Sequence, residues 1–283
     1  MPERLDVVDS TNRYLVDLAK AGVPGGLEIP EGYAVVAESQ SAGRGRRDRT
    51  WEAPAGSAVL CSILFRPDLG PDELHLVTWA VALAAVQACR ITSGVDLSLK
   101  WPNDLIALEE PLGDAPGSGA RSRDAERKVA GILAEALTHR GDEDSGETTG
   151  KPAGIVVGIG INVNWPPDWP PVGSTDPALA DIAARATSLD RLAGHPVDKR
   201  ELVDHFLRGA GRWNEMLASS RGRRSVVNDY RLACATIGQE VRVELENETV
   251  AGVALDVDNA GHLLVSTETG PRTIAAGDVV HVR

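Results

Sequence analysis

The sequence predicts an α+β protein that ends in a small β-barrel. Residues 58–65 form a nearly continuous apolar run, which is typical of a buried strand. Residues 71–91 instead repeat leucine, valine and alanine at helical spacing, as a packed helix does. After about residue 225 the pattern changes to short strands at regular spacing, joined by turns, which favours a barrel. We therefore expect two domains, at 1–224 and 225–283.

The other elements follow from caps, apolar periodicity and turn residues. The first helix begins near Ser10, because Asp9 or Ser10 can cap it and Gly22 can end it. Further strands are expected at 33–38, 97–100, 105–108, 128–137 and 154–163, and helices at 176–184, 198–217 and 226–232. The barrel strands are expected at 241–245, 250–257, 262–266, 272–275 and 278–282. Residues 109–127 and 141–151 are expected to be surface loops, and 219–224 a polar break.

Composition narrows the classes of function. Of the 283 residues, 42% are hydrophobic and 25% charged, as in an ordinary soluble protein. The formal net charge of −12 argues against a nucleic-acid partner. Cys61, Cys89 and Cys234 form no C-x-x-C pair, which suits a reducing cytosol and disfavours disulfides or zinc. With no signal-peptide pattern and no run of about 18 apolar residues, we expect a cytoplasmic protein without a membrane partner.

Residues 40–51, called the arginine loop below, concentrate positive charge. The loop contains Gly43, Arg44, Gly45, Arg46, Arg47 and Arg49, with Asp48 as its acidic residue. Arginine forks match carboxylate and phosphate oxygens, and glycine lets the backbone come close to a ligand. The loop therefore predicts a cradle for a small molecule that carries a phosphate or a carboxylate. A solvated basic turn is the alternative for a charge run taken alone.

Two further polar clusters lie at the ends of predicted elements. Ser10, Thr11 and Asn12 would sit at a helix N-terminus, where unpaired N–H groups favour ligand polar atoms, although a plain cap explains them equally well. Lys100 ends a strand, where it can neutralise a carboxylate or phosphate, although an isolated lysine there is usually a surface charge. Asp104, four residues later, could approach a magnesium ion carried in with phosphates.

The segment Gly158-Ile-Gly160-Ile-Asn162 invites a Rossmann interpretation that fails. Val163 stands where the third glycine should be, and the glycines lie inside a strand. Glycines within a strand more often mark close approach of a ligand or another backbone, and Asn162 could then contact an adenine edge. The sequence contains neither a P-loop nor a G-x-S-x-G motif.

Five motifs together resemble the biotin protein ligase family across roughly residues 8–165. They are Ser-Thr-Asn, Gly-Arg-Gly-Arg-Arg-x-Arg-x-Trp, Lys-Trp-Pro-Asn-Asp, Lys-Val-Ala-Gly-Ile-Leu and Gly-Ile-Gly-Ile-Asn-Val. The resemblance implies a class II synthetase or lipoate-ligase type of mixed sheet flanked by helices, with an SH3-like C-terminal domain. It also implies an ATP-dependent ligase that forms biotinyl-5′-AMP with Mg²⁺ and transfers biotin to a lysine of a biotin carboxyl carrier domain.

The resemblance also assigns roles to residues. Lys100 and Arg46 would be catalytic, with Lys100 between the biotin carboxylate and the α-phosphate. The biotin-binding set would be Ser10, Thr11, Asn12, Gln40, Gly43, Arg44, Gly45, Arg46, Lys100, Gly131 and Gly158. The ATP-binding set would be Arg46, Arg47, Trp51, Asn103 and Asn162. Asp104 would be the residue nearest Mg²⁺.

The chain departs from the family pattern in two places. Asp48 stands where the family usually has glycine, which puts the ligand geometry of the arginine loop in question. Nine residues precede Ser10 and include no helix-turn-helix domain, so we expect an enzyme and not a repressor. The alternatives are a lipoyl or octanoyl ligase of the same superfamily, a biotin sensor without catalysis, or a nucleic-acid binder. We expect a monomer.

Overall fold

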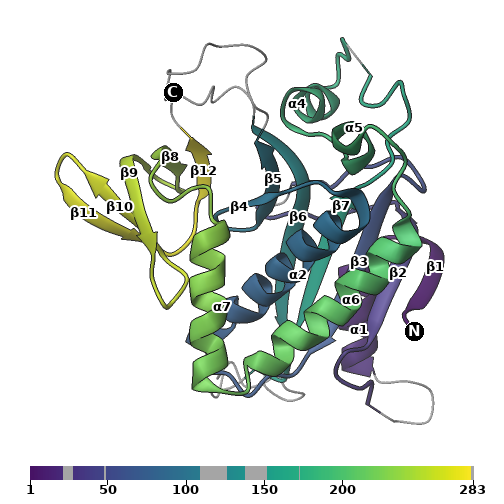
Figure 1. The fold of residues 1–283 in the computed structure, drawn as a ribbon, viewed down its shortest axis with the longest axis horizontal. Helices are drawn as coiled ribbons and strands as arrows, with labels where there is room; N and C mark the ends of the chain where they lie inside the picture. The colour runs from purple at the N-terminus through teal and green to yellow at the C-terminus, as the bar shows by residue number, and fades with distance from the viewer. Residues whose placement is uncertain (22–27, 48, 109–125, 138–151, 172, 282–283) are drawn as a thin grey trace.

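The structure is a computed structural model that describes residues 1–21, 28–47, 49–108, 126–137, 152–171 and 173–281. Its larger part is built on a seven-stranded sheet of order β1-β2-β3-β7-β6-β5-β4 (Figure 1). The strands are β1 (Glu3–Val8), β2 (Ala34–Gln40), β3 (Ala58–Phe65), β4 (Ser98–Lys100), β5 (Asp104–Leu108), β6 (Glu126–Leu137) and β7 (Gly154–Asn162). The sheet is mixed, because β1 pairs parallel with β2 and the other neighbours pair antiparallel.

Helices cover both faces of this sheet. They are α1 (Thr11–Ala21), α2 (His75–Ser93), α4 (Pro177–Arg185), α5 (Leu189–Ala193), α6 (Lys199–Met216) and α7 (Ser220–Ala233), with a 3-10 turn η1 (Pro71–Glu73) before α2. On one face, Ile63 of β3 belongs to the core that α2 and α6 complete. On the other, Leu64 belongs to a second cluster with Leu15 of α1. Since both faces of β3 are buried, its sequence is apolar without alternation.

Helix α2 owes its long apolar sequence to this central position. Among the described helices, it is long and apolar enough to cross a membrane, but most of that stretch is buried inside the structure. It packs against α6 and α7 as well as the sheet (Figure 1). The hydropathy of α2 is therefore that of a core helix.

The C-terminal part forms a separate antiparallel sheet of order β11-β10-β9-β8-β12. Its strands are β8 (Glu240–Glu244), β9 (Thr249–Val257), β10 (Leu263–Thr267), β11 (Gly270–Ile274) and β12 (Asp278–His281). Figure 1 shows this sheet beside the larger one, next to β4 and α7. The predicted fold class, a mixed sheet flanked by helices followed by a small C-terminal β domain, is confirmed.

Several local predictions were wrong. The break predicted at 219–224 is the first turn of α7, where the side chain of Ser219 accepts a hydrogen bond from Gly222 N. Its arginines misled the prediction, because an amphipathic helix can place them on its solvent face. The loop predicted at 109–127 ends earlier, since Glu126 and Arg127 pair with β5. Strand β1 and helix α5 were missed.

The position of the domain boundary stays a prediction. Residue 225 lies within α7, and the C-terminal sheet begins at Glu240. Residues 141–151 lie outside the described residues, as do 109–125 and Gly22.

Candidate active site

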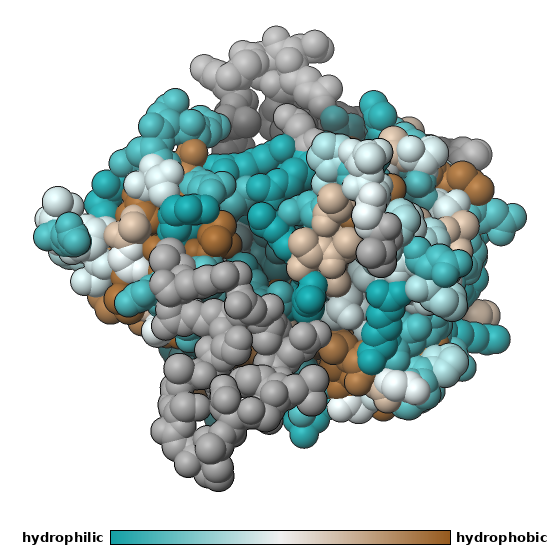
Figure 2. Space-filling model, turned by 90° about the horizontal axis from the view of Figure 1, so that it is seen from above, coloured by the Kyte–Doolittle hydropathy of each residue, from teal (hydrophilic) through white to brown (hydrophobic). Residues whose placement is uncertain are grey.

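A pocket of about 320 Å³ opens where the two sheets approach each other. Figure 2 shows a hollow with hydrophilic side chains in the middle of this face of the molecule. The start of α1, the arginine loop, the β4–β5 turn, β6 and β7 all contribute to its walls. Asp278 and Val279 of β12 complete the lining from the C-terminal sheet.

What we call the polar end of the pocket is lined by Ser10, Thr11, Asn12 and Gln40, and Thr11 and Asn12 are hydrogen-bonded to Ser62. The backbone N–H of Thr11 donates to Gln40 Oε1 at 2.8 Å, and Ser62 Oγ donates to Asn12 Oδ1 at 2.6 Å. Ser10, Thr11 and Asn12 are all nearly fully buried. The structure thus brings together the residues predicted at the helix N-terminus and Gln40.

Gly158 permits this arrangement. A Cβ on Gly158 would collide with Asn12 Oδ1 and would lie 3.0 Å from Ser62 Oγ. Any larger residue at this position of β7 would therefore displace the side chain of Asn12.

Trp51 lies over the neighbouring glycines of the sheet. A Cβ on Gly160 would lie 2.5 Å from Trp51 Cε2, and one on Gly131 would lie 3.1 Å from Cζ3. Lys128 Nζ is 5.8 Å from the ring centroid. The indole Nε1–H is buried and has no hydrogen-bond partner among the described residues. A buried donor usually finds a partner, and the indole N–H groups of Trp165 and Trp169 are likewise buried without one among the described residues.

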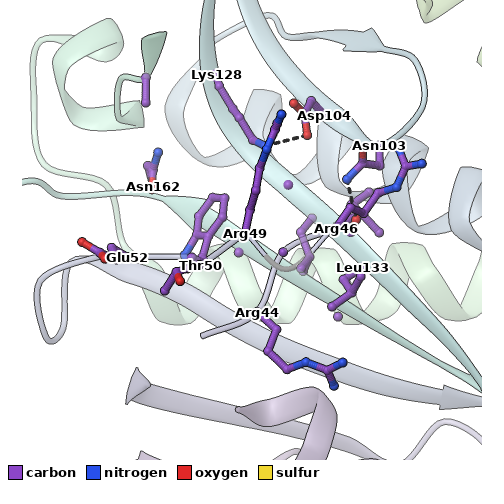
Figure 3. Close-up of a pocket in the computed structure, with 18 of the residues that line it drawn as sticks. Arg44, Arg46, Arg49, Thr50, Glu52, Asn103, Asp104, Lys128, Leu133 and Asn162 are labelled. Atoms are coloured by element: carbon purple, nitrogen blue, oxygen red, sulfur yellow. Dashed lines mark hydrogen bonds and ion pairs between the residues drawn. The ribbon is translucent and has the colours of Figure 1, made fainter. Parts of the chain in front are cut away.

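The arginine loop folds back on itself and spreads its side chains in different directions. Gly45 N donates to Arg49 O at 2.6 Å, and Trp51 N donates to Gly43 O at 3.0 Å. Arg44 Nη1 lies 2.8 Å from Glu135 Oε1, whose other oxygen accepts from Asn12 Nδ2 at 2.9 Å. In Figure 3, Arg44 extends away from Arg46.

Arg46 is the loop arginine that points towards the β4–β5 turn (Figure 3). Its Nη1 donates to Asn103 Oδ1 at 3.2 Å, and Asn103 Nδ2 donates to Ile132 O at 2.8 Å. Burial lowers the pKa of Arg46, because the charged guanidinium loses solvation. A guanidinium held by a neutral amide in this position would gain from an anionic ligand.

Arg47 takes a different direction from the predicted adenylate contact. Its φ of 52° turns the chain, and its Nη1 donates to Glu244 O at 2.9 Å. Its guanidinium lies 3.5 Å from Asp278 Oδ2, which also pairs with Arg49 at 2.7 Å. Gly43 and Arg47 are not among the described residues that line the pocket. The arginine loop is therefore attached to the C-terminal sheet.

Lys100 is paired within the protein. Its Nζ forms an ion pair with Glu126 Oε1, and Glu126 Oε2 lies 2.7 Å from His281 Nδ1 of β12. Burial alone would raise the pKa of the Glu126 carboxyl. The hydrogen bond from His281 and the charge of Lys100 outweigh burial and lower it to about 2. Glu126 is thus a fixed anion beside Lys100.

Asp104, the residue predicted nearest Mg²⁺, is paired within the protein. Its Oδ1 lies 2.7 Å from Lys128 Nζ, as the dashed line in Figure 3 marks. Among the described residues, no group of three or more His, Cys, Asp or Glu side chains could hold a metal ion. Asn162 lines the pocket with its amide nitrogen already donating to Thr187 O at 3.0 Å.

Sequence reasoning missed several residues of the pocket. Lys128 and Gly160 stand inside motifs that were singled out, so their signal was present but unused. Glu126 and Asp278 carry no such signal, because each is one acid among 41. Only the approach of the C-terminal sheet brings Asp278 to the arginine loop.

The comparisons with known proteins agree with this arrangement. Residues 5–162 match the biotin/lipoate A/B protein ligase family, and residues 236–282 match the biotin protein ligase C terminal domain. The chain is 32% identical over 287 residues to a "Biotin--[acetyl-CoA-carboxylase] ligase" of Mycobacterium tuberculosis, covering 99% of this chain and 90% of the relative. It is 30% identical over 275 residues to the bifunctional ligase/repressor BirA of Bacillus spizizenii, covering 97% and 72%.

A solved structure shares the fold. The biotin protein ligase from Aquifex aeolicus in complex with biotin and ATP superposes with a TM-score of 0.69 at 24% identity, covering 99% of this chain and 97% of that one. The chain therefore belongs to the biotin/lipoate A/B protein ligase family. Within that family, its C-terminal domain and its full-length relatives place it among the biotin protein ligases.

Proposed function

We propose that the chain is an ATP-dependent ligase that activates biotin as biotinyl-5′-AMP. It then transfers biotin to a lysine of a carrier domain of the acetyl-CoA-carboxylase type. The observation that carries this proposal is the pocket, which joins a neutral polar end to a cationic end containing Lys100 and Arg46. A ligand with a polar ureido ring at one end and a carboxylate at the other matches this polarity.

The chemistry requires two anions to meet. In the first step a biotin carboxylate oxygen attacks the α-phosphorus of ATP, and pyrophosphate leaves with the electrons of the broken P–O bond. Lys100 and Arg46 offset the repulsion and the charge that develops. In the second step a carrier lysine, as the free amine, attacks the carbonyl carbon, and AMP leaves. The amide that forms releases one proton.

Other residues of the pocket would orient the substrates. The polar end, with Thr11, Asn12 and Gln40, supplies donors and acceptors for the ureido group. Trp51 presents a flat ring and the unpaired Nε1–H, which fits a nucleotide base. Covering the adenylate with the arginine loop would exclude water from a reactive anhydride.

Magnesium would arrive on the phosphates of ATP, where it supplies further neutralisation of charge. Among the described residues, the carboxylate of Asp104 is a poor ligand for magnesium, because it forms an ion pair with Lys128. No step of the proposed reaction is therefore assigned to a metal-bound residue.

ATP–pyrophosphate exchange tests the proposal directly. Purified protein with MgATP is given biotin, lipoate or neither acid, and label exchange is measured. Biotin-dependent exchange is the expected result. Exchange with lipoate alone would make the chain a lipoyl ligase, and biotin binding without exchange would make it a sensor. A carrier domain of the acetyl-CoA-carboxylase type then tests transfer.

We propose that the protein acts as a monomer in the cytoplasm, with no nucleic-acid partner. We also propose a catalytic domain at residues 1–224, to whose pocket Asp278 and Val279 contribute, and a C-terminal domain at residues 225–283. Sedimentation of the purified chain, with and without biotin and ATP, tests the first of these.

A further inference from the structure

The C-terminal part of the chain holds strand β4 on both sides of Lys100. Ala235 N donates to Leu99 O at 2.8 Å, and Trp101 N donates to Thr236 Oγ1 at 3.1 Å. Further along, Trp101 Nε1 donates to Gly261 O at 2.9 Å. The residues before and after Lys100 are therefore fixed by the segment that follows α7.

The side chain of Lys100 is reached by the same part of the molecule. Glu126 accepts from Lys100 with one oxygen and from His281 with the other. His281 Nε2 lies 3.3 Å from Thr236 Oγ1, the atom that already holds Trp101 N. The side chains of Lys100, Glu126 and His281 are only 17%, 19% and 11% exposed, so solvent screens these contacts weakly.

Such a chain of contacts limits where the ammonium group can be. A free lysine side chain loses rotamer entropy when it is held in one place. Glu126 can hold it only if the carboxylate is itself fixed and charged. His281 fixes the carboxylate and favours its charged form, because it places a hydrogen-bond donor at the second carboxylate oxygen.

We propose that His281 positions the Lys100 ammonium for catalysis by fixing Glu126. Glu126 and His281 are positioning residues, since Lys100 is the group that would touch the substrates. This inference rests on the proposed function, which makes Lys100 catalytic. It assigns to β12 a part in the reaction that the five sequence motifs do not contain.

Two substitutions of similar shape separate the proposed contact from simple packing. In His281→Asn the amide nitrogen can take the place of Nδ1 and still donate to Glu126. In His281→Gln it reaches the place of Nε2, towards Thr236. We expect His281→Asn to keep kcat for biotin-dependent exchange within about threefold of the unaltered protein. His281→Gln should lower kcat about tenfold, because a small misplacement of a catalytic group slows the reaction markedly. The KM for biotin should change little in both.

A double-mutant cycle tests whether His281 acts through Glu126. Glu126→Gln should lower kcat about as much as His281→Gln, and the double variant should lose no more than Glu126→Gln alone. Two exposed ion pairs supply matched controls, His205→Gln on α6 and Glu248→Gln in the C-terminal sheet, and both should leave kcat unchanged. Thermal melts of every variant identify losses caused by unfolding.

The outcomes that overturn the inference differ from those that overturn the function. Absence of biotin-dependent exchange in the unaltered protein contradicts the proposed function. If the unaltered protein is active, then an equal kcat for His281→Gln and His281→Asn contradicts the inference. Additive losses in the double variant do so too, as does a higher kcat in Glu126→Gln, which would show that Glu126 restrains Lys100.

Discussion

Gly158 and Gly160 lie in β7 beneath two different parts of the pocket. Gly158 makes room for Asn12, and Gly160 makes room for the ring of Trp51. The sequence pointed to close approach at these glycines, because they interrupt an apolar strand. It could not tell what approaches them, since Asn12 and Trp51 are more than 100 residues away along the chain.

Gly158→Ala should weaken biotin binding far more than it weakens the fold. The new methyl group would meet Asn12 Oδ1 and displace that side chain at the polar end of the pocket. Calorimetry should show at least a tenfold higher Kd for biotin. Gly211→Ala in α6 is the control, because a Cβ there meets nothing within 4 Å and should stabilise the helix by about 0.5–1 kcal/mol.

Lys100→Ala should abolish most adenylation while leaving the protein folded. Loss of a preorganised cation at the reacting phosphate costs about 100-fold or more in kcat. Glu126 keeps its contact with His281, so the substitution does not leave a carboxylate without a partner. Exchange assays and thermal melts check both parts. Lys199→Ala, which removes a surface pair with Glu38, is the matched control. A large drop in Tm for Lys100→Ala alone would mark Lys100 as structural.

At the scale of elements, the arginine loop depends on β12 for its position. Asp278 pairs with Arg47 and Arg49, while Arg46 lines the pocket and donates to Asn103. The sequence predicted a ligand cradle from the density of arginines. It could not show which arginines contact a ligand and which contact the protein. That difference depends on contacts with strand β12, some 230 residues later in the chain.

Asp278→Asn should release the loop. Each of the two ion pairs is partly exposed and contributes about 0.2–1 kcal/mol, so we expect the loop to open about two- to thirtyfold more often. Limited trypsin digestion, which cleaves after arginine, should cut within residues 44–49 faster by that factor. Glu248→Gln, which breaks the exposed pair with Arg272, should digest like the unaltered protein. Equal digestion of all three proteins would contradict a role for Asp278 in holding the loop.

At the scale of the whole molecule, the two sheets are joined at the pocket. Trp101 donates to Gly261, Arg47 to Glu244, and His281 pairs with Glu126. The fold class and most elements could be predicted, because buried strands and amphipathic helices leave local patterns. The contacts between the two parts could not, since they depend on single polar residues without periodicity. Strand β1 was missed because its charged residues resemble those of an exposed tail.

The junction should make stability depend on pH in a defined direction. The Glu126 carboxyl has its pKa lowered to about 2, so its stabilisation is fully present above about pH 4.5 and is lost as the pH falls towards 2. Urea unfolding at pH 7 and pH 3 should therefore show that the free energy of unfolding falls more for the unaltered protein than for Glu126→Gln. We expect a difference on the order of 1–2 kcal/mol. The same pH dependence in both proteins would show that the Glu126 contacts contribute nothing to folding.

The strand order has a consequence for how the protein is made. Ser10 to Asn12 leave the ribosome early, but β7, which supplies Gly158 beneath them, follows about 150 residues later. Asp278 and His281 of β12, which pair with the arginine loop and with Glu126, come later still. A growing chain thus carries the polar end of its pocket long before it can close the cationic end. The contacts of β12 with the arginine loop and with Glu126 can therefore form only when synthesis has reached β12.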